Sequence, residues 1–138
     1  MKSETFNLEE ELLREEIIKR GAKRVLLQLP EGLKAEGPRL AAMVEQTGAL
    51  AIVSADPCYG ACDLATLDAE TLAVDLLVHY GHSKIMKEGG QIQTIYIEAR
   101  AKINVETAVK EAIPLLADFK NIGLVTTIQH VQTLNEVM

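Results

Sequence analysis

The stretch RVLLQLP, residues 24–30, is the clearest indication of fold class in this chain. It is a short apolar run that ends at a proline, which is typical of a strand buried on both faces of a sheet. Similar runs follow at four places: ALAIVSA at 49–55, VDLLVHY at 74–80, QTIYIEA at 93–99 and NIGLVTT at 121–127. Most of them are continuously apolar rather than alternating, which favours a parallel sheet covered on both faces.

Helical patterns separate these runs. Residues 8–20 carry leucine and isoleucine at near-helical spacing, with Asn7 as the expected N-cap and Gly21 as the stop. Further helices are expected at 34–47, from Asp63 onward, and from Asn104 to about Pro114, where the proline should end the helix early. We therefore predict an α/β fold: a three-layer Rossmann-like domain with a mainly parallel sheet of about five strands, near 24–29, 50–54, 74–79, 93–97 and 121–126.

Length and charge exclude several classes of protein. The 138 residues suit one domain with its own core, and no window approaches the ~20 apolar residues of a membrane span. The net charge of −6 comes without a basic stripe, so a nucleic acid is not expected as a partner, and the lack of a long apolar window means that no membrane is expected either. The first residues lack a secretory pattern, so we expect a cytoplasmic protein with reduced thiols.

The last residues, HVQTLNEVM at 130–138, have the pattern of the first turns of a helix without a stop signal. We therefore predict that residues 1–128 form one Rossmann-like domain. Residues 129–138 are then expected to be the start of a truncated second domain.

The predicted sheet gathers the reactive side chains on one edge. Right-handed crossovers put the carboxyl ends of all parallel strands together, and ligands of open α/β sheets bind there. The loops expected on that edge carry Cys58, Cys62, His79, His82, His130, Glu31, Asp56 and Asp63. This convergence predicts a functional site.

The two cysteines allow several interpretations. A disulfide across four residues is geometrically awkward, and a thioredoxin-type pair needs two intervening residues where SADPCYGACDLA, residues 54–65, has three. Structural zinc could take Cys58, Cys62, His79 and His82 as its four ligands, whereas an iron–sulfur cluster normally needs three or four cysteines. Spacing alone favours a zinc site over an iron–sulfur cluster. The interpretation that both cysteines are inert is almost as well supported as the zinc site.

Four motifs add a family resemblance. QLPEGL, YGACD, GHS and VTTIQH occur in this order, and from about residue 22 to the end the chain resembles the archaeal diphthamide-synthesis enzymes, the 2-(3-amino-3-carboxypropyl)histidine synthases. Members have three similar α/β domains, each of which gives one cysteine to a [4Fe-4S] cluster. The resemblance implies that this chain is the first of those domains, truncated.

The resemblance also implies an activity. Members transfer the 3-amino-3-carboxypropyl group of S-adenosylmethionine to a histidine of translation elongation factor two, the first step of diphthamide synthesis, by a radical mechanism unlike that of ordinary radical S-adenosylmethionine enzymes. The full-length enzyme is expected to be a homodimer. Because the other two cluster cysteines have no counterpart here, the 138 residues alone are expected to be inactive.

The family pattern assigns roles to individual residues. The cysteine of Y-G-x-C matches Cys62, which would be the cluster ligand, and Cys58 would be a bystander. Gly60 and Ala61 would let the backbone approach the cofactor closely. The catalytic candidates, which would hold S-adenosylmethionine or move a proton, are Glu31, His79, His82 and His130. The alternative from a different class is a non-enzymatic zinc-binding or protein-interaction module.

Overall fold

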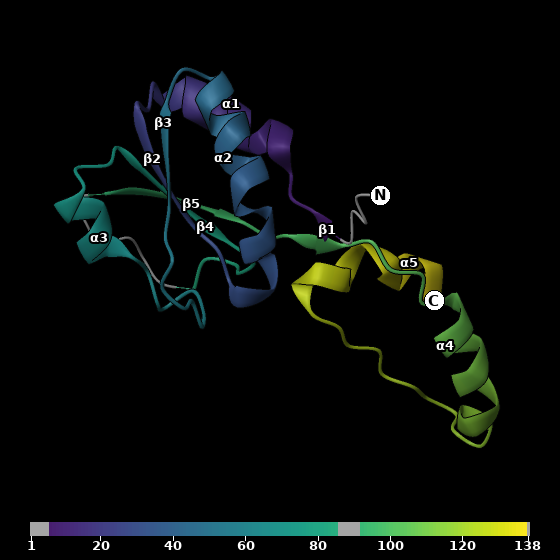
Figure 1. Cartoon of the computed structure of the whole chain (residues 1–138). Helices are drawn as coiled ribbons and strands as arrows, with labels where there is room; N and C mark the ends of the chain where they lie inside the picture. The colour runs from purple at the N-terminus through teal and green to yellow at the C-terminus, as the bar shows by residue number, and fades with distance from the viewer. Residues whose placement is uncertain (1–5, 86–91, 138) are drawn as a thin grey trace. The chain divides into compact units, whose positions relative to one another are not determined.

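The computed structural model describes residues 6–85 and 92–137, and it divides the chain into two compact units. One unit is Leu8–Ala99, and the other comprises Met1–Asn7 with Arg100–Met138. Figure 1 shows both along the chain. The boundary predicted after residue 128 concerns a longer protein and stays a prediction.

The unit Leu8–Ala99 contains a parallel sheet. Its strands are β2 (Arg24–Gln28), β3 (Leu50–Val53), β4 (Leu76–Tyr80) and β5 (Gln93–Ile97), in the spatial order β3-β2-β4-β5. All three strand pairings are parallel, so the predicted parallel sheet is confirmed for four of its five strands.

The fifth predicted strand, at 121–126, is wrong. Residues 121–127 have no regular structure, are exposed and belong to the other unit. An apolar run becomes a strand only where a neighbouring strand satisfies its backbone N–H and C=O groups. Among the described residues no strand pairs with 121–127, so β5 is an edge strand of the sheet.

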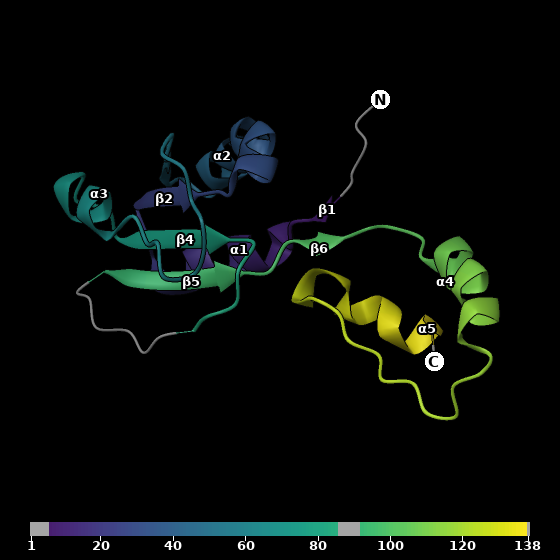
Figure 2. The same cartoon turned by 90° about the horizontal axis from the view of Figure 1, so that it is seen from below.

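Helices cover both faces of the sheet (Figure 2). They are α1 (Glu10–Arg20), α2 (Gly37–Gln46), which continues from a 3-10 helix at Glu31–Glu36, and α3 (Thr66–Thr71). Gly21 ends α1 as predicted, at φ 62°, with its N–H bonded to carbonyls of the last turn. The predicted cap at Asn7 is wrong, because Asn7 lies in the short strand β1 (Phe6–Asn7) and Glu9 occupies the cap position.

Strand alternation assigns the two faces of the sheet. Leu26 of β2 and Leu77 of β4 pack against Ala69 of α3 and Val74. The intervening strand residues point the other way, where α1 and α2 lie in contact with each other. The buried side chains on that side include Leu13, Ile17, Leu40, Val44, Val25, Leu27, Val78 and Tyr80. The three-layer α/β prediction is therefore confirmed.

The other unit is smaller. In it, β1 pairs antiparallel with β6 (Arg100–Ala101), and α4 (Glu106–Ala112) is followed by a 3-10 helix at Ile113–Leu116. Val105 occupies the cap position of α4, one residue after the predicted Asn104, although Asn104 Oδ1 accepts the Glu106 N–H at 2.8 Å. The α-helix ends just before Pro114, as predicted. A second 3-10 helix (Ile128–Thr133) leads into α5 (Leu134–Val137), which confirms the helical pattern at the end of the chain. Among the described residues, no helix has the length and hydrophobicity needed to cross a membrane.

Candidate functional site

The site begins with two buried polar residues at the carboxyl ends of adjacent strands. Gln28 ends β2 and pairs in register with His79 of β4. Each lies two residues beyond a leucine that packs on α3, so both side chains point to that face. Gln28 is 3% exposed and His79 is fully buried, so their polar atoms need partners inside the protein.

The Gln28 amide supplies those partners and fixes the protonation of the imidazole. Its Nε2 donates to the Asp63 carbonyl at 2.6 Å, so its Oε1 is the accepting end. That oxygen accepts the Ala65 N–H at 3.2 Å and lies 2.8 Å from His79 Nδ1. Because an amide oxygen can only accept, His79 carries its proton on Nδ1, and its Nε2 has a free lone pair.

His82 faces that lone pair. Its Nδ1 lies 3.0 Å from His79 Nε2, and the two rings are tilted with centroids 5.1 Å apart. Gly81, at φ +81°, makes the turn that brings His82 back over the end of β4. Burial lowers the pKa of His79 to about 4, and the charge of His82 acts in the same direction while that of Asp63 opposes it. His79 is therefore a neutral acceptor at neutral pH.

Cys58 completes a group of three with these histidines. The thiol is buried, and the ligating atoms of Cys58, His79 and His82 all lie within 4.8 Å of one another. Burial raises the pKa of the Cys58 thiol, and a hydrogen bond from the Gly60 N–H partly offsets that rise. We call these three residues the Cys58 group.

Cys62, four residues later, is exposed. It lies in a tight turn in which the Asp63 N–H donates to the Gly60 carbonyl at 3.0 Å and the Asp63 carboxylate accepts the Tyr59 N–H at 3.1 Å. The short helix expected from Asp63 starts only at Thr66, so Cys62 precedes a turn rather than a helix. The geometry holds the thiol at the surface of the carboxyl edge of the sheet.

Lys34 fastens the other end of this loop. Its ammonium donates to the carbonyls of Ala55 at 2.5 Å and Asp56 at 2.8 Å, and it pairs with the Glu31 carboxylate at 2.6 Å. Glu31 thus lies on the predicted edge with its side chain mostly exposed. The loop is held at its start by Lys34 and at its end by Gln28.

The structure corrects two sequence-based groupings. Among the described residues, the four-ligand zinc set is not assembled, because Cys62 is absent from the group that Cys58, His79 and His82 form. His130 belongs to the other unit, where its Nδ1 is buried without a hydrogen-bond partner among the described residues. Since 121–127 is not a strand of the sheet, the argument that placed His130 on its edge no longer holds.

Sequence reasoning missed Gln28 and Lys34. Gln28 had a signal, because it is the one polar side chain inside the apolar run VLLQL, at 25–29. A polar residue in a buried strand needs a partner, yet the run does not show which loop provides it.

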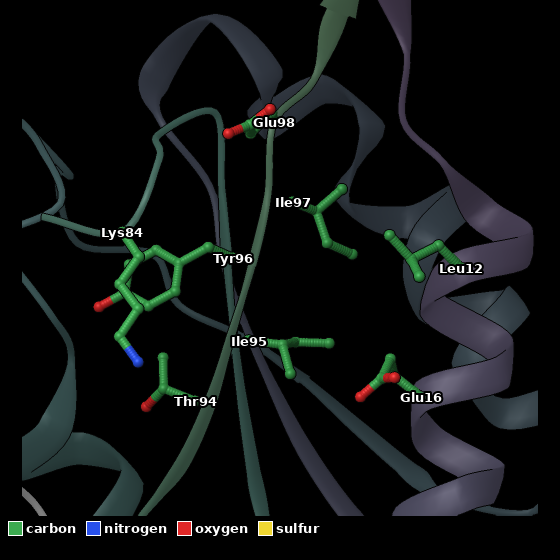
Figure 3. A pocket seen from close by; sticks show the side chains of 8 residues that line it. All are labelled: Leu12, Glu16, Lys84, Thr94, Ile95, Tyr96, Ile97 and Glu98. Atoms are coloured by element: carbon green, nitrogen blue, oxygen red, sulfur yellow. The ribbon is translucent and has the colours of Figure 1, made fainter. Parts of the chain in front are cut away.

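A shallow pocket lies beside this site, along the edge strand. Figure 3 shows Ile95 and Ile97 of β5 on the side of Leu12 and Glu16 of α1, with Thr94 and Tyr96 on the side of Lys84. Tyr96 also contacts the His79 ring at a centroid distance of 5.4 Å. None of the Cys58 group lines this pocket, so the pocket and the ligand cluster are separate features.

Comparison with known proteins gives the family. A family model for diphthamide synthesis proteins matches residues 29–138. The 2-(3-amino-3-carboxypropyl)histidine synthase of Pyrococcus horikoshii is 38% identical over 134 residues, which are 91% of this chain and 38% of the relative. Subunit 1 of the corresponding synthase of Schizosaccharomyces pombe is 39% identical over 120 residues, which are 86% of this chain and 28% of the relative. The chain is therefore similar to both archaeal and eukaryotic members.

Solved structures agree with the sequence matches. The crystal structure of Dph2 from Pyrococcus horikoshii superposes with a TM-score of 0.82 at 34% identity, over 95% of this chain and 39% of that chain. The structure of the same protein with a 4Fe-4S cluster gives a TM-score of 0.81 at 35% identity, over 94% of this chain and 39% of that one. The chain therefore spans well under half the length of these relatives, and it belongs to the family of diphthamide synthesis proteins, as its QLPEGL, YGACD, GHS and VTTIQH motifs predict.

Proposed function

We propose that this chain is the first cysteine-bearing domain of a 2-(3-amino-3-carboxypropyl)histidine synthase and that Cys62 is its ligand to a [4Fe-4S] cluster. The observation that carries the proposal is the contrast between the two thiols: Cys62 is exposed on a fastened turn, whereas Cys58 is buried. A similar fold has been solved with a 4Fe-4S cluster, which supports the assignment.

The residues present fit one corner of such a cluster. Cluster irons are held by cysteine thiolates, and a single domain that offers one exposed thiol needs the remaining ligands from elsewhere. The Cys62 turn meets this requirement because its sulfur faces outward and its backbone is tied to Asp63. Gly60 would let a cofactor approach the backbone closely, because the space beside it is open: an added Cβ would meet only the Cys62 sulfur, at 3.8 Å. Ala61, which lies in the same turn, is buried.

When bound, the cluster would supply the electron that cleaves the methionine-side C–S bond of S-adenosylmethionine, so that the 3-amino-3-carboxypropyl group can be transferred to a histidine of translation elongation factor two. The chain's own residues hold the Cys62 loop in place and provide groups for proton transfer at the same edge. Of the catalytic candidates, His82 suits this role better than His79, because both ring nitrogens of His79 already face partners. Glu31, which lies on this edge, remains a candidate for binding the amino acid end of the substrate, whereas His130 belongs to the other unit and is no longer placed at this site.

The full-length protein is proposed to act in the cytoplasm as a homodimer. The name of the fission yeast relative, "subunit 1", describes a protein that works with further subunits. A non-enzymatic zinc module is less well supported, because a closed structural zinc site needs four protein ligands and the described residues bring together three.

The test uses a full-length synthase that contains this segment, with Cys62→Ala compared with Cys58→Ala. After anaerobic reconstitution, Cys62→Ala should lose cluster iron and sulfide and the transfer of labelled 3-amino-3-carboxypropyl to elongation factor two. Cys58→Ala should keep most of its cluster. The 138-residue chain alone should hold no stable cluster, since one thiolate cannot replace three. Equal loss of iron in both variants, or a stoichiometric cluster on the isolated chain, would contradict the assignment.

A further inference from the structure

We propose that Cys58, His79 and His82 form a mononuclear site for a divalent transition-metal ion of the zinc class, separate from the cluster thiol Cys62. One sulfur and two imidazole nitrogens converge within 4.8 Å at the carboxyl edge of the sheet. The inference does not rest on the proposed cluster ligand, because it uses neither Cys62 nor any segment outside Leu8–Ala99, although it shares His82 with the proposed proton-transfer group.

The two nitrogens are already near the spacing that a metal requires. His79 Nε2 and His82 Nδ1 lie 3.0 Å apart. Two ligands at Zn–N distances of about 2.0–2.1 Å in a tetrahedral site are separated by roughly 3.3 Å. Since every pair of these atoms lies within 4.8 Å, the sulfur needs to approach by at most about 1.3 Å to reach the roughly 3.5 Å expected for an S···N edge. Cys58 lies on a loop, whereas His79 lies in β4, which is paired with strands on both sides, so we expect the thiol to make this movement.

The orientation of His79 is set before any metal binds. Its Nδ1–H is bonded to Gln28 Oε1, which leaves Nε2 as the coordinating atom. Metal-binding histidines usually donate their other N–H to an oxygen in this way, which fixes the tautomer and the ring plane. Gln28 is in turn held by the Asp63 carbonyl and the Ala65 N–H, so the supporting bonds are complete. A buried histidine bonded in this manner is ready to bind a cation.

The donor set selects the class of ion. Thiolate and imidazole ligands suit Zn²⁺ and Co²⁺, and they are poor ligands for Mg²⁺ and Ca²⁺, which prefer oxygen. Three protein ligands leave one position open for water or another small ligand, as in zinc sites that do chemistry rather than only stabilise a fold. The Asp63 carboxylate acts electrostatically on both Cys58 and His79, so it can balance the charge that the cation adds.

The test is an anaerobic titration of the metal-free 138-residue chain with Co²⁺, followed by competition with Zn²⁺. One equivalent of Co²⁺ should give the intense visible bands of a tetrahedral ion and a thiolate-to-cobalt charge-transfer band, and Zn²⁺ should displace it. Cys58→Ser should remove the charge-transfer band and weaken binding by at least about tenfold. His82→Asn should weaken binding similarly, and because His82 is only half-buried this variant avoids the folding risk of replacing His79.

Cys62→Ser is the matched control, because it changes a cysteine in the same loop that lies outside the Cys58 group. It should bind Co²⁺ with unchanged affinity and spectrum. Absence of a tetrahedral spectrum in the wild-type chain, unchanged affinity in Cys58→Ser, or loss of the charge-transfer band in Cys62→Ser would each overturn the proposal. Circular dichroism of each variant confirms that the fold is intact.

Discussion

His79 and Tyr80 are neighbours on β4, and their side chains point to opposite faces of the sheet. The two side chains also differ in whether their polar atoms are hydrogen-bonded. On the α3 face, the His79 ring is bonded through both nitrogens, to Gln28 and His82. On the face of α1 and α2, the Tyr80 hydroxyl is fully buried and has no hydrogen-bond partner among the described residues. Burying a polar group is costly unless it is hydrogen-bonded. On the α3 face the buried polar groups bond to one another and to the cysteine loop, whereas the buried Tyr80 hydroxyl on the other face gains no such bond among the described residues. The candidate functional site lies on the face where the polar groups are hydrogen-bonded.

Gln28→Ala should have the largest effect on this contrast. It removes three hydrogen bonds and leaves the His79 Nδ1–H and the Asp63 carbonyl unpaired. We expect the free energy of unfolding to fall by about 2–4 kcal/mol in a urea titration. Gln93→Ala is the matched control, since the side chain of Gln93 lies on the exposed end of β5 and bonds to Arg20 at the surface. Equal losses in the two variants would show that the Gln28 bonds add nothing.

Gly81→Ala, at the turn between Tyr80 and His82, should lower the free energy of unfolding by less than Gln28→Ala does. Gly81 has φ +81°, and a Cβ there would lie 3.0 Å from Pro30 Cγ, so both conformation and space oppose a side chain. We expect a loss of about 1–3 kcal/mol in unfolding free energy, together with weaker Co²⁺ binding because His82 follows directly. Gly32→Ala, where no atom lies within 4 Å of the added Cβ, serves as the control. A cost at Gly32 as large as that at Gly81 would contradict this explanation.

Tyr80→Phe should have the smallest effect at neutral pH, between no change and a gain of about 1 kcal/mol, because it removes a buried hydroxyl that bonds to nothing among the described residues. At high pH the two proteins should differ. Burial raises the pKa of Tyr80 above that of an unfolded tyrosine, so the unfolded state loses its proton first. The stability of the wild type is therefore complete below pH ~10 and falls as pH rises further, and Tyr80→Phe should reduce that fall.

The check is urea unfolding of both proteins from neutral pH to above pH ~10, where tyrosine ionises. Tyr59→Phe is the control, since Tyr59 is 84% exposed and should leave the alkaline decline unchanged. An identical decline in wild type and Tyr80→Phe would mean that Tyr80 ionises as readily in the folded protein as in the unfolded chain.

Most of the sheet could be predicted because burial on both faces leaves a direct trace in the sequence. RVLLQ, LAIV, LLVHY and QTIYI all became strands where apolar runs had indicated them. The run at 121–127 has the same local character and did not, because strand formation depends on a partner that local sequence does not specify. Helix starts were likewise uncertain by a few residues, as at Asn7 and Asp63.

The sequence was enough to predict that the candidate site lies at the carboxyl edge of the sheet. It was not enough to predict which side chains contact one another there. The carboxyl-edge rule correctly brought Cys58, His79 and His82 together. It could not show that Cys58 turns inward while Cys62 faces solvent, because that depends on the turn around Gly60 and on hydrogen bonds from Gln28 and Asp63. The family pattern alone separated the two cysteines, and the role that it gives Cys62 stays a prediction.

The cysteine loop is fastened at both ends by side chains of β2 and the helix after it, Gln28 and Lys34. Gln28 and Lys34 lie six residues apart in the chain and donate hydrogen bonds to the backbone carbonyls of Asp63 and Asp56. These two bonds fix both ends of the loop, and therefore the number of residues that fits between them. An inserted or deleted residue between Asp56 and Asp63 would therefore break one of these two attachments. The length of the cysteine loop, and not only its sequence, is therefore constrained by the QLPEGLK segment at residues 28–34.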